Sequence, residues 1–142
     1  DACIGVDVIV GYPTESEDDF FETYNFLKKR DVSYLHVFTY SERENTKAIK
    51  LEPVVPYEER ARRSKILREL SDQKRVNFYE RSVGQIRPVL VEKSKNGILF
   101  GYTDNYIKTR IQGHISLENT IQNVFISEAK LNYVESEVIS IN

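Results

Sequence analysis

The first forty residues follow a strand–helix–strand pattern, which restricts the possible folds more than any other feature of the chain. The run VDVIVGYP at residues 6–13 is apolar and β-branched and ends in Gly and Pro, as expected for a strand buried on both faces of a parallel sheet. Phe20, Tyr24 and Leu27 then fall on one helical face, and a second strand is predicted at about residues 34–40. Together these segments predict a right-handed βαβ unit.

The predicted helix carries capping signals at both ends. Ser16 is a favourable N-cap, and Asp19 stands three residues later, as in a capping box. Acidic residues crowd the first turn and the basic residues 28–30 crowd the last, so both ends suit the helix dipole.

A second, longer helix is predicted from about residue 57 to residue 82, between Pro56 and Gly84. It is the one segment with an excess of Lys and Arg, in a chain of net charge −2. Because affinity for phosphates depends on clustered Lys and Arg, the overall charge alone does not predict nucleic-acid binding. Its apolar stripe is formed by Ile66, Leu67 and Leu70 and continues at Phe78 and Tyr79.

From Ile86 onward the pattern changes to short strands separated by turns. Asn96-Gly97 is a strong hairpin signal, and another turn is predicted around residues 103–105. About five short strands in this region favour a small closed barrel. The change of pattern predicts two domains, residues 1–82 and 83–142.

The composition is that of a soluble globular protein, with 30% charged and 40% hydrophobic residues. No apolar run is long enough for a transmembrane helix, so we expect no membrane partner and a cytoplasmic location. The single cysteine, Cys3, excludes an internal disulfide. Neither Cys3 nor the two histidines have the spacing of metal ligands, so no metal site is expected. No Ser, Thr or Cys stands beside an evident base for nucleophilic catalysis.

Polar loops follow both predicted strands, at Gly11–Glu15 and Thr39–Thr46. Ligands of α/β sheets bind at the carboxyl ends of strands, so these loops form a candidate binding rim. Arg43 has a planar guanidinium that suits a carboxylate or a phosphate. The alternative is that Arg43 satisfies loop carbonyls or pairs with Glu42.

The predicted barrel carries a second candidate site. Tyr102 and Tyr106 flank a turn, and Lys108 and Arg110 follow at alternate positions, which places these two on one face of a strand. Small barrels of the oligonucleotide-binding type use aromatic residues for base stacking and basic residues for phosphates. The alternative is a tyrosine pair in the barrel core, with both basic residues merely solvated.

Three separated motifs occur in order along the chain: DVIVGYPTESEDDFFETYNFL, YLHVFTYSERENTKA and GYTDNYIK. They resemble the radical-SAM tRNA methylthiotransferases, which have an IVGFPGET strand end, a YS-x-R-x-G-T-x-A loop and a terminal TRAM domain. The resemblance covers nearly the whole chain. The motifs YLHVFTYSER and GYTDNYIK are most similar to those of the branch that methylthiolates threonylcarbamoyladenosine 37 of tRNA. The isopentenyladenosine branch is the alternative.

The resemblance implies an α/β part followed by an all-β part. Residues 1–82 would be the last βαβ elements and long helix of a radical-SAM partial barrel, and residues 83–142 a five-stranded, OB-like TRAM domain that binds the tRNA anticodon stem-loop. Contacts with S-adenosyl-L-methionine would come from Gly11, Pro13, Phe38, Tyr40 and Ser41. Contacts with the substrate would come from Arg43, Tyr102, Tyr106, Lys108 and Arg110.

The chain departs from the family's sequence motifs in the two loops that follow the predicted strands. Asn45 replaces a glycine, and Asn tolerates a left-handed backbone better than most residues. In the PGET segment Thr14 replaces a glycine, Glu15 is retained, and Ser16 replaces the capping threonine, which is a mild change.

The family enzymes hold two [4Fe–4S] clusters, and each cluster needs several thiolates. This chain has one cysteine and no methionine, and it begins beside an apolar run. We therefore expect it to be part of a longer enzyme that holds S-adenosyl-L-methionine and both clusters, and to bind none of them and be inactive alone. A sheet opened in this way would expose a strand edge and favour homo-oligomers. A free-standing RNA-binding module is the alternative, but it does not explain the βαβ start.

Overall fold

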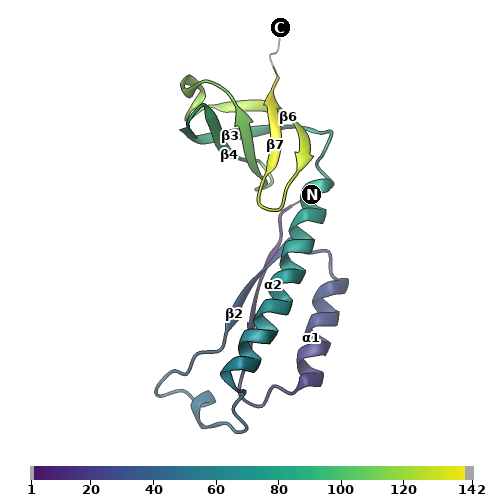
Figure 1. Cartoon of the computed structure of the whole chain (residues 1–142), viewed down its shortest axis with the longest axis vertical. Coiled ribbons are helices and arrows are strands. Elements are labelled where there is room, and N and C mark those ends of the chain that lie inside the picture. The colour runs from purple at the N-terminus through teal and green to yellow at the C-terminus, as the bar shows by residue number, and fades with distance from the viewer. Residues whose placement is uncertain (1, 140–142) are drawn as a thin grey trace. The chain divides into compact units, whose positions relative to one another are not determined.

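The computed structural model describes residues 2–139, which form two compact units. The α/β unit comprises residues 4–74, and the barrel unit comprises residues 75–139 together with residues 2 and 3. Figure 1 shows the helices and strands of both units. Each unit has its own hydrophobic core. No helix within the described part of the chain is long and apolar enough to cross a membrane.

The α/β unit contains the predicted βαβ arrangement. Its strands pair in parallel, with Gly5 opposite Tyr34 and Val10 opposite Thr39. The second strand ends at Thr39, one residue earlier than expected. In chain order the elements are β1 (Gly5–Val10), α1 (Glu17–Lys29), β2 (Tyr34–Thr39), the 3-10 turn η1 (Ala48–Lys50) and the first part of α2 (Tyr57–Glu80).

Helix α1 begins with the predicted capping box. The backbone N–H of Asp19 donates to the Ser16 hydroxyl at 3.1 Å, and the Ser16 N–H donates to the Asp19 carboxylate at 2.9 Å. These bonds satisfy two of the donors that a helix N-terminus leaves free. The hydrogen bond from the Ser16 hydroxyl also lowers the pKa of Asp19.

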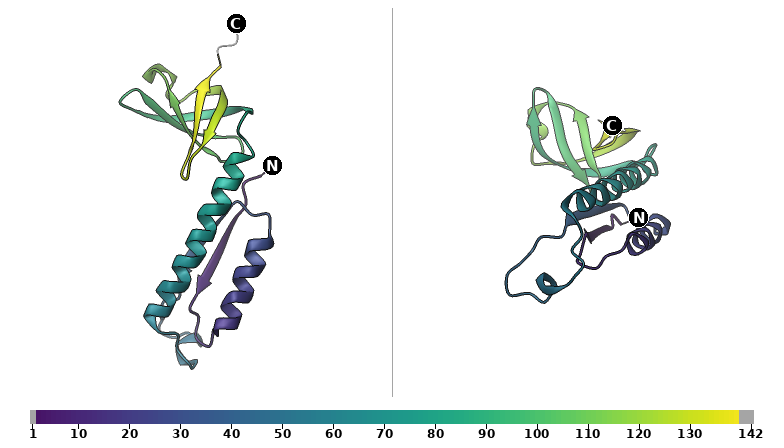
Figure 2. Two further views of the ribbon diagram at one scale, coloured as in Figure 1. Left: turned by 45° about the vertical axis from the view of Figure 1, so that its right-hand side comes forward. Right: turned by 60° about the horizontal axis from the view of Figure 1, so that its bottom comes forward.

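Both helices pack on one face of the two-stranded sheet (Figure 2). We expected β1 to be buried on both faces, and this expectation is wrong for the described chain. Ile9 and Phe38, which lie opposite each other across the two strands, are 57% and 53% exposed. The reason is that residues 2–139 provide helices for one face of the sheet only. The core of this face consists of Val10, Phe20, Leu27, Leu35, Leu67 and Leu70.

The barrel unit is a closed five-stranded barrel with the strand order β3-β4-β5-β7-β6. Strands β5 and β7 close it in parallel, and the other neighbours are antiparallel. This confirms the predicted barrel. The elements are β3 (Ile86–Lys95), β4 (Ile98–Thr103), β5 (Lys108–Gln112), the 3-10 turn η2 (Ile115–Leu117), β6 (Ile121–Ala129) and β7 (Val134–Val138).

The predicted hairpin joins β3 to β4. Asn96 and Gly97 both have positive φ, 52° and 76°, as a two-residue type I′ turn requires. Gly101 is a second position that needs glycine, because a side chain there would collide with the Leu90 carbonyl of the neighbouring strand. The interior is filled by eight fully buried aliphatic residues: Val89, Val91, Leu99, Ile107, Ile111, Val124, Ile126 and Val134.

Helix α2 serves both cores. Leu67 and Leu70 lie in the core of the α/β unit, whereas Phe78 and Tyr79 lie in the core of the barrel unit. The helix ends at Glu80, two residues before the predicted end. The predicted apolar stripe is therefore present, but it is divided between two separate cores.

Candidate functional site

The carboxyl ends of β1 and β2 meet, as predicted for neighbouring parallel strands. The Tyr40 N–H donates to the Val10 carbonyl at 2.8 Å, directly after the last paired residues. The first rim loop (residues 11–15) and the second rim loop (residues 40–46) therefore start side by side. Together they form the candidate rim of the α/β unit.

The predicted cofactor residues differ in their exposure at this rim. Gly11 and Pro13 are buried, whereas Tyr12 between them is exposed. Phe38 and Ser41 are exposed as well. Tyr12 and Thr14 are therefore the exposed residues of the first rim loop. Tyr12 was not singled out from the sequence, because nothing in the loop motif marks it.

Tyr40 lies at the centre of the rim. Its ring meets the Tyr12 ring edge-on, with centroids 5.4 Å apart, and the Arg60 guanidinium lies 5.4 Å from its ring centroid. Its hydroxyl is buried and has no hydrogen-bond partner within residues 2–139. A buried hydroxyl without a partner costs about 1–3 kcal/mol, so this atom calls for a group outside the described residues.

The second rim loop leaves the Arg43 guanidinium free. Glu42 pairs with Arg60 at 2.7 Å, not with Arg43, and no side-chain bond of Arg43 exists within the described part of the chain. The loop is closed by a bond from the Thr46 hydroxyl to the Arg43 carbonyl at 2.8 Å. Asn45 has φ 65°, the left-handed conformation that its substitution for glycine anticipated.

The first rim loop contains a strained residue. Thr14 has φ 75°, although a β-branched residue rarely adopts a left-handed backbone. Its N–H donates to the Pro53 carbonyl at 2.9 Å, which fixes the loop. The replacement of glycine by Thr14 therefore falls at a position whose backbone favours glycine.

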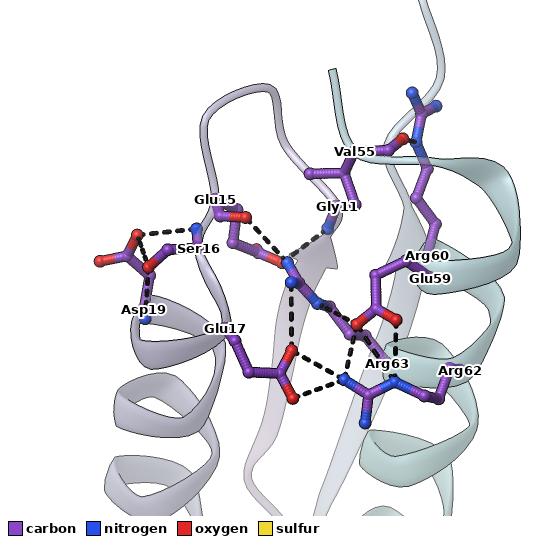
Figure 3. A network of polar contacts seen from close by, with 10 residues as sticks. All are labelled: Gly11, Glu15, Ser16, Glu17, Asp19, Val55, Glu59, Arg60, Arg62 and Arg63. Carbon is purple, nitrogen blue, oxygen red and sulfur yellow. Dashed lines mark hydrogen bonds and ion pairs between the residues drawn. The ribbon is translucent and has the colours of Figure 1, made fainter. Parts of the chain in front are cut away.

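A network of charged residues from α2 holds the first rim loop (Figure 3). Arg63, whose side chain is only 5% exposed, donates to the Glu15 carboxylate at 2.5 Å and to the Glu15 carbonyl at 3.0 Å. The same carboxylate accepts the Gly11 N–H at 3.0 Å. The Glu59 carboxylate accepts hydrogen bonds from both Arg62 and Arg63. These bonds, of which the one from Arg62 has the larger effect, lower the pKa of Glu59 to about 2.

Arg60, one helical turn earlier, holds the second rim loop. It donates to the Tyr40 carbonyl at 3.1 Å, the Val55 carbonyl at 2.8 Å and the Glu42 carboxylate at 2.7 Å. The bond from Arg60 lowers the pKa of Glu42. Gly11 has φ 75°, and a side chain there would collide with the aliphatic stem of Arg60. Gly11 is therefore explained by the approach of Arg60.

In the barrel unit, Tyr102 and Tyr106 lie on the outer surface and not in the core. They are 37% and 75% exposed, with ring centroids 6.1 Å apart. Tyr106 has φ 64°, and its turn is fixed by the bond from the Ile107 N–H to the Thr103 hydroxyl at 2.8 Å. A hollow of about 450 Å³ lies beside Tyr106. It is lined by Ala2, Cys3, Arg87, Asp104, Asn105 and Tyr106.

Lys108 and Arg110 share the outer face of β5, as the alternation predicted. Lys108 lies directly opposite Tyr102 on β4. Arg110 donates to Glu135 on β7 at 2.5 Å, and its guanidinium lies 5.9 Å from the Tyr133 ring centroid. The structure thus brings Tyr102, Tyr106 and Lys108 together, and Arg110 is engaged by its neighbours.

An iron–sulfur cluster and an organic cofactor need different side chains, and the described residues differ in how they suit each. Within residues 2–139 no group of three His, Cys, Asp or Glu side chains could hold a metal, and the sequence has one cysteine, so these residues do not fit an iron–sulfur cluster. The Tyr12 and Tyr40 rings are in contact at the rim, and Arg43 is exposed in the second rim loop, so aromatic and cationic groups are available there.

Comparison with known proteins finds relatives that match both units of the chain. The TRAM domain family matches residues 80–139. A threonylcarbamoyladenosine tRNA methylthiotransferase of Aquifex aeolicus is 48% identical over 112 residues, 78% of this chain and 26% of that protein. A Bacillus subtilis protein of the same name is 38% identical over 140 residues, 95% of this chain and 31% of its own length.

A relative with another substrate in its name is also similar. A tRNA-2-methylthio-N(6)-dimethylallyladenosine synthase of Endomicrobium trichonymphae is 33% identical over 139 residues, 98% of this chain and 33% of that protein. The chain thus spans about a quarter to a third of the length of these curated relatives. Residues 80–139 match the TRAM domain family, and the chain as a whole is similar to part of proteins named as tRNA methylthiotransferases.

Proposed function

We propose that the chain is the TRAM-bearing part of a cytoplasmic enzyme that methylthiolates C2 of N6-threonylcarbamoyladenosine 37 in tRNA. The observation that carries this proposal is the 48% identity to the Aquifex aeolicus protein whose name specifies that base. The loop wording YLHVFTYSER and the turn GYTDNYIK support the same branch. In the complete enzyme, S-adenosyl-L-methionine and two [4Fe–4S] clusters supply the methyl group and the sulfur chemistry.

In this proposal residues 1–82 provide one wall of the cofactor and substrate site. Exposed Phe38 and Ser41 and the half-buried Tyr40 face the cofactor, and buried Gly11 and Pro13 shape the loop behind it. Arg43 binds a carboxylate or phosphate of the substrate, since its guanidinium is free of partners within the described residues. The threonyl carboxylate of threonylcarbamoyladenosine is a group of this class.

Residues 83–142 hold the anticodon stem-loop of tRNA in this proposal. Tyr102 and Tyr106 offer exposed rings for base stacking, and Lys108 lies opposite Tyr102 to bind a phosphate. Arg110 binds a second phosphate, although Glu135 reduces its free charge. The exposure of both tyrosines supports this role over a place in the barrel core.

The second candidate substrate is N6-dimethylallyladenosine, or isopentenyladenosine. It is favoured by the 33% identity to the dimethylallyladenosine synthase, which extends over 98% of the chain. The two candidates differ chemically at one point. The dimethylallyl group is apolar, so a free Arg43 would have no carboxylate to bind.

Nucleoside mass spectrometry tests the proposal. The complete protein is expressed in a strain that lacks its own tRNA methylthiotransferases, and the nucleosides of total tRNA are analysed. We expect the 2-methylthio derivative of threonylcarbamoyladenosine. The 2-methylthio derivative of isopentenyladenosine alone would establish the second candidate, and the absence of both products would refute the enzymatic proposal.

A further inference from the structure

We infer that Arg60 and Arg63, which we name the α2 clamp, are positioning residues that set the conformation of the two rim loops from behind. Neither residue lies in a motif of the rim, and in the sequence both belong to the basic stretch EERARRSK. The inference rests on the proposed function, because it assigns the clamp to the cofactor and substrate rim.

The first argument is burial. The side chains of Arg60 and Arg63 are 8% and 5% exposed, although most arginines of a basic helix are solvated. A buried guanidinium is tolerated only where its donors find acceptors. Here the acceptors are carbonyls and carboxylates of the rim loops and their surroundings, so the burial of these two charges is tied to one loop geometry.

The second argument is that two arginines one helical turn apart each bind a different rim loop. Arg60 binds the backbone and Glu42 of the second rim loop, and Arg63 binds the backbone and side chain of Glu15 in the first rim loop. One rigid helix thus holds both loops that follow the sheet. A displacement of either guanidinium would move its loop relative to the other.

The third argument is that the contacts reach the candidate ligand groups themselves. Arg60 binds the carbonyl of Tyr40, contacts its ring, and holds Glu42 immediately before Arg43. Arg63 reaches Gly11 through the Glu15 carboxylate. These links explain why a buried arginine, and not an apolar residue, occupies each position.

The experiment compares Arg60→Lys with Arg62→Lys in the 142-residue chain. Arg62 lies on the same helix and forms ion pairs with Glu17 and Glu59, but within residues 2–139 it makes no bond to either rim loop, so it serves as the matched control. Lysine keeps the charge and loses the planar fork. NMR order parameters of residues 41–43 should fall from about 0.85 to below about 0.6 in Arg60→Lys and stay unchanged in Arg62→Lys.

Hydrogen exchange separates positioning from general support of the fold. The Leu35 amide, which donates to the Ser71 hydroxyl at 2.8 Å, reports the core of the same unit. We expect Arg63→Lys to speed exchange of the Gly11 amide about tenfold or more while Leu35 changes little. Equal acceleration at both amides, or unchanged order in residues 41–43 of Arg60→Lys, would overturn the inference.

A second variant avoids the risk that loss of a buried arginine unfolds the unit. Glu42→Gln removes the ion pair at a half-exposed carboxylate. In the complete protein, Arg60→Lys and Glu42→Gln should each raise KM for S-adenosyl-L-methionine or for tRNA, by roughly tenfold for Arg60→Lys, with kcat little changed. If the enzyme is active and KM for both substrates is unchanged, the inference about the α2 clamp is overturned but the proposed function is not. If the complete protein forms no methylthiolated product, the proposed function is refuted, and the NMR comparison still tests the α2 clamp.

Discussion

The two units of the chain differ in how they pair their strand edges and bury their apolar residues. The barrel unit closes its sheet, so all five strands have two neighbours and its interior aliphatic residues are fully buried. The α/β unit has two strands that pair only with each other within the described residues, and one of its sheet faces is exposed. Its rim is fixed by buried arginines that pair with more exposed carboxylates.

This difference teaches where each candidate site can be studied. The tyrosines and Lys108 of the barrel unit lie on the outside of a closed fold, so their proposed contacts with RNA can be tested in this chain. The proposed rim of the α/β unit would provide one wall only, so its proposed ligand contacts are tested in the complete protein. The comparison also predicts that the barrel unit depends on apolar packing and that the rim of the α/β unit depends on ion pairing.

The largest expected effect comes from a cavity in each core. Leu99 lies in the barrel and Leu67 in the α/β unit, and both are fully buried. Leu99→Ala and Leu67→Ala should each lower the free energy of unfolding by about 3 kcal/mol. Urea titration followed by NMR signals of each unit measures this. Loss of both sets of signals at one midpoint in either variant would show that the units do not unfold independently.

The next effect concerns acid stability of the α/β unit. Bonds from Arg62 and Arg63 lower the pKa of Glu59 from 4.5 to about 2. Because the folded pKa is depressed, this stabilisation is present above pH 4.5 and is lost as pH falls toward 2. Glu59→Gln should therefore be less stable than the original chain at pH 7 and more nearly equal to it near pH 2.

Circular dichroism of thermal unfolding at several pH values checks this expectation. Glu69→Gln is the matched control, because Glu69 lies exposed on the same helix and makes no ion pair within the described residues. The ionic account of the rim is wrong if Glu59→Gln and Glu69→Gln show the same pH dependence.

Much of the fold could be predicted from the sequence because its signals are local. The capping box at Ser16, the Asn96-Gly97 turn and the left-handed Asn45 all depend on residues close in the chain. The bare sheet face at Ile9 could not be predicted, because an apolar β-branched run does not say how many helices cover it. The α2 clamp was missed for a similar reason. Arg63 meets Glu15 across 48 positions, and sequence spacing carries no sign of that contact.

A smaller effect is expected at the strained rim. Thr14→Gly removes a β-branched residue from φ 75°, which should stabilise the α/β unit by about 1 kcal/mol after the entropy cost of glycine. Thr46→Gly, in the exposed second rim loop, is the comparison, since Thr46 has no positive φ and its hydroxyl bonds the Arg43 carbonyl. The midpoint temperature of thermal unfolding should rise for Thr14→Gly and fall for Thr46→Gly. A lower midpoint for Thr14→Gly would contradict the claim that the Thr14 backbone is strained.

The smallest effect concerns self-association of the open sheet. Free strand edges and the exposed Ile9 predict weak dimers at high protein concentration. Ile9→Lys should reduce the association, whereas Ile115→Lys, at a similarly exposed position of the barrel unit, should not. Light scattering across a concentration series measures it, and a monomer at all concentrations would end this proposal.

The most direct test of the account is tRNA binding by the 142-residue chain over a range of salt concentrations. We predict weak binding whose dependence on salt becomes shallower by about one ion in Lys108→Glu, and binding that is reduced at all salt concentrations in Tyr106→Gly, which keeps the left-handed backbone and removes the ring. Glu135→Gln should strengthen binding, because it releases Arg110. Binding that is the same in all three variants and in the original chain would contradict the assignment of this face to RNA.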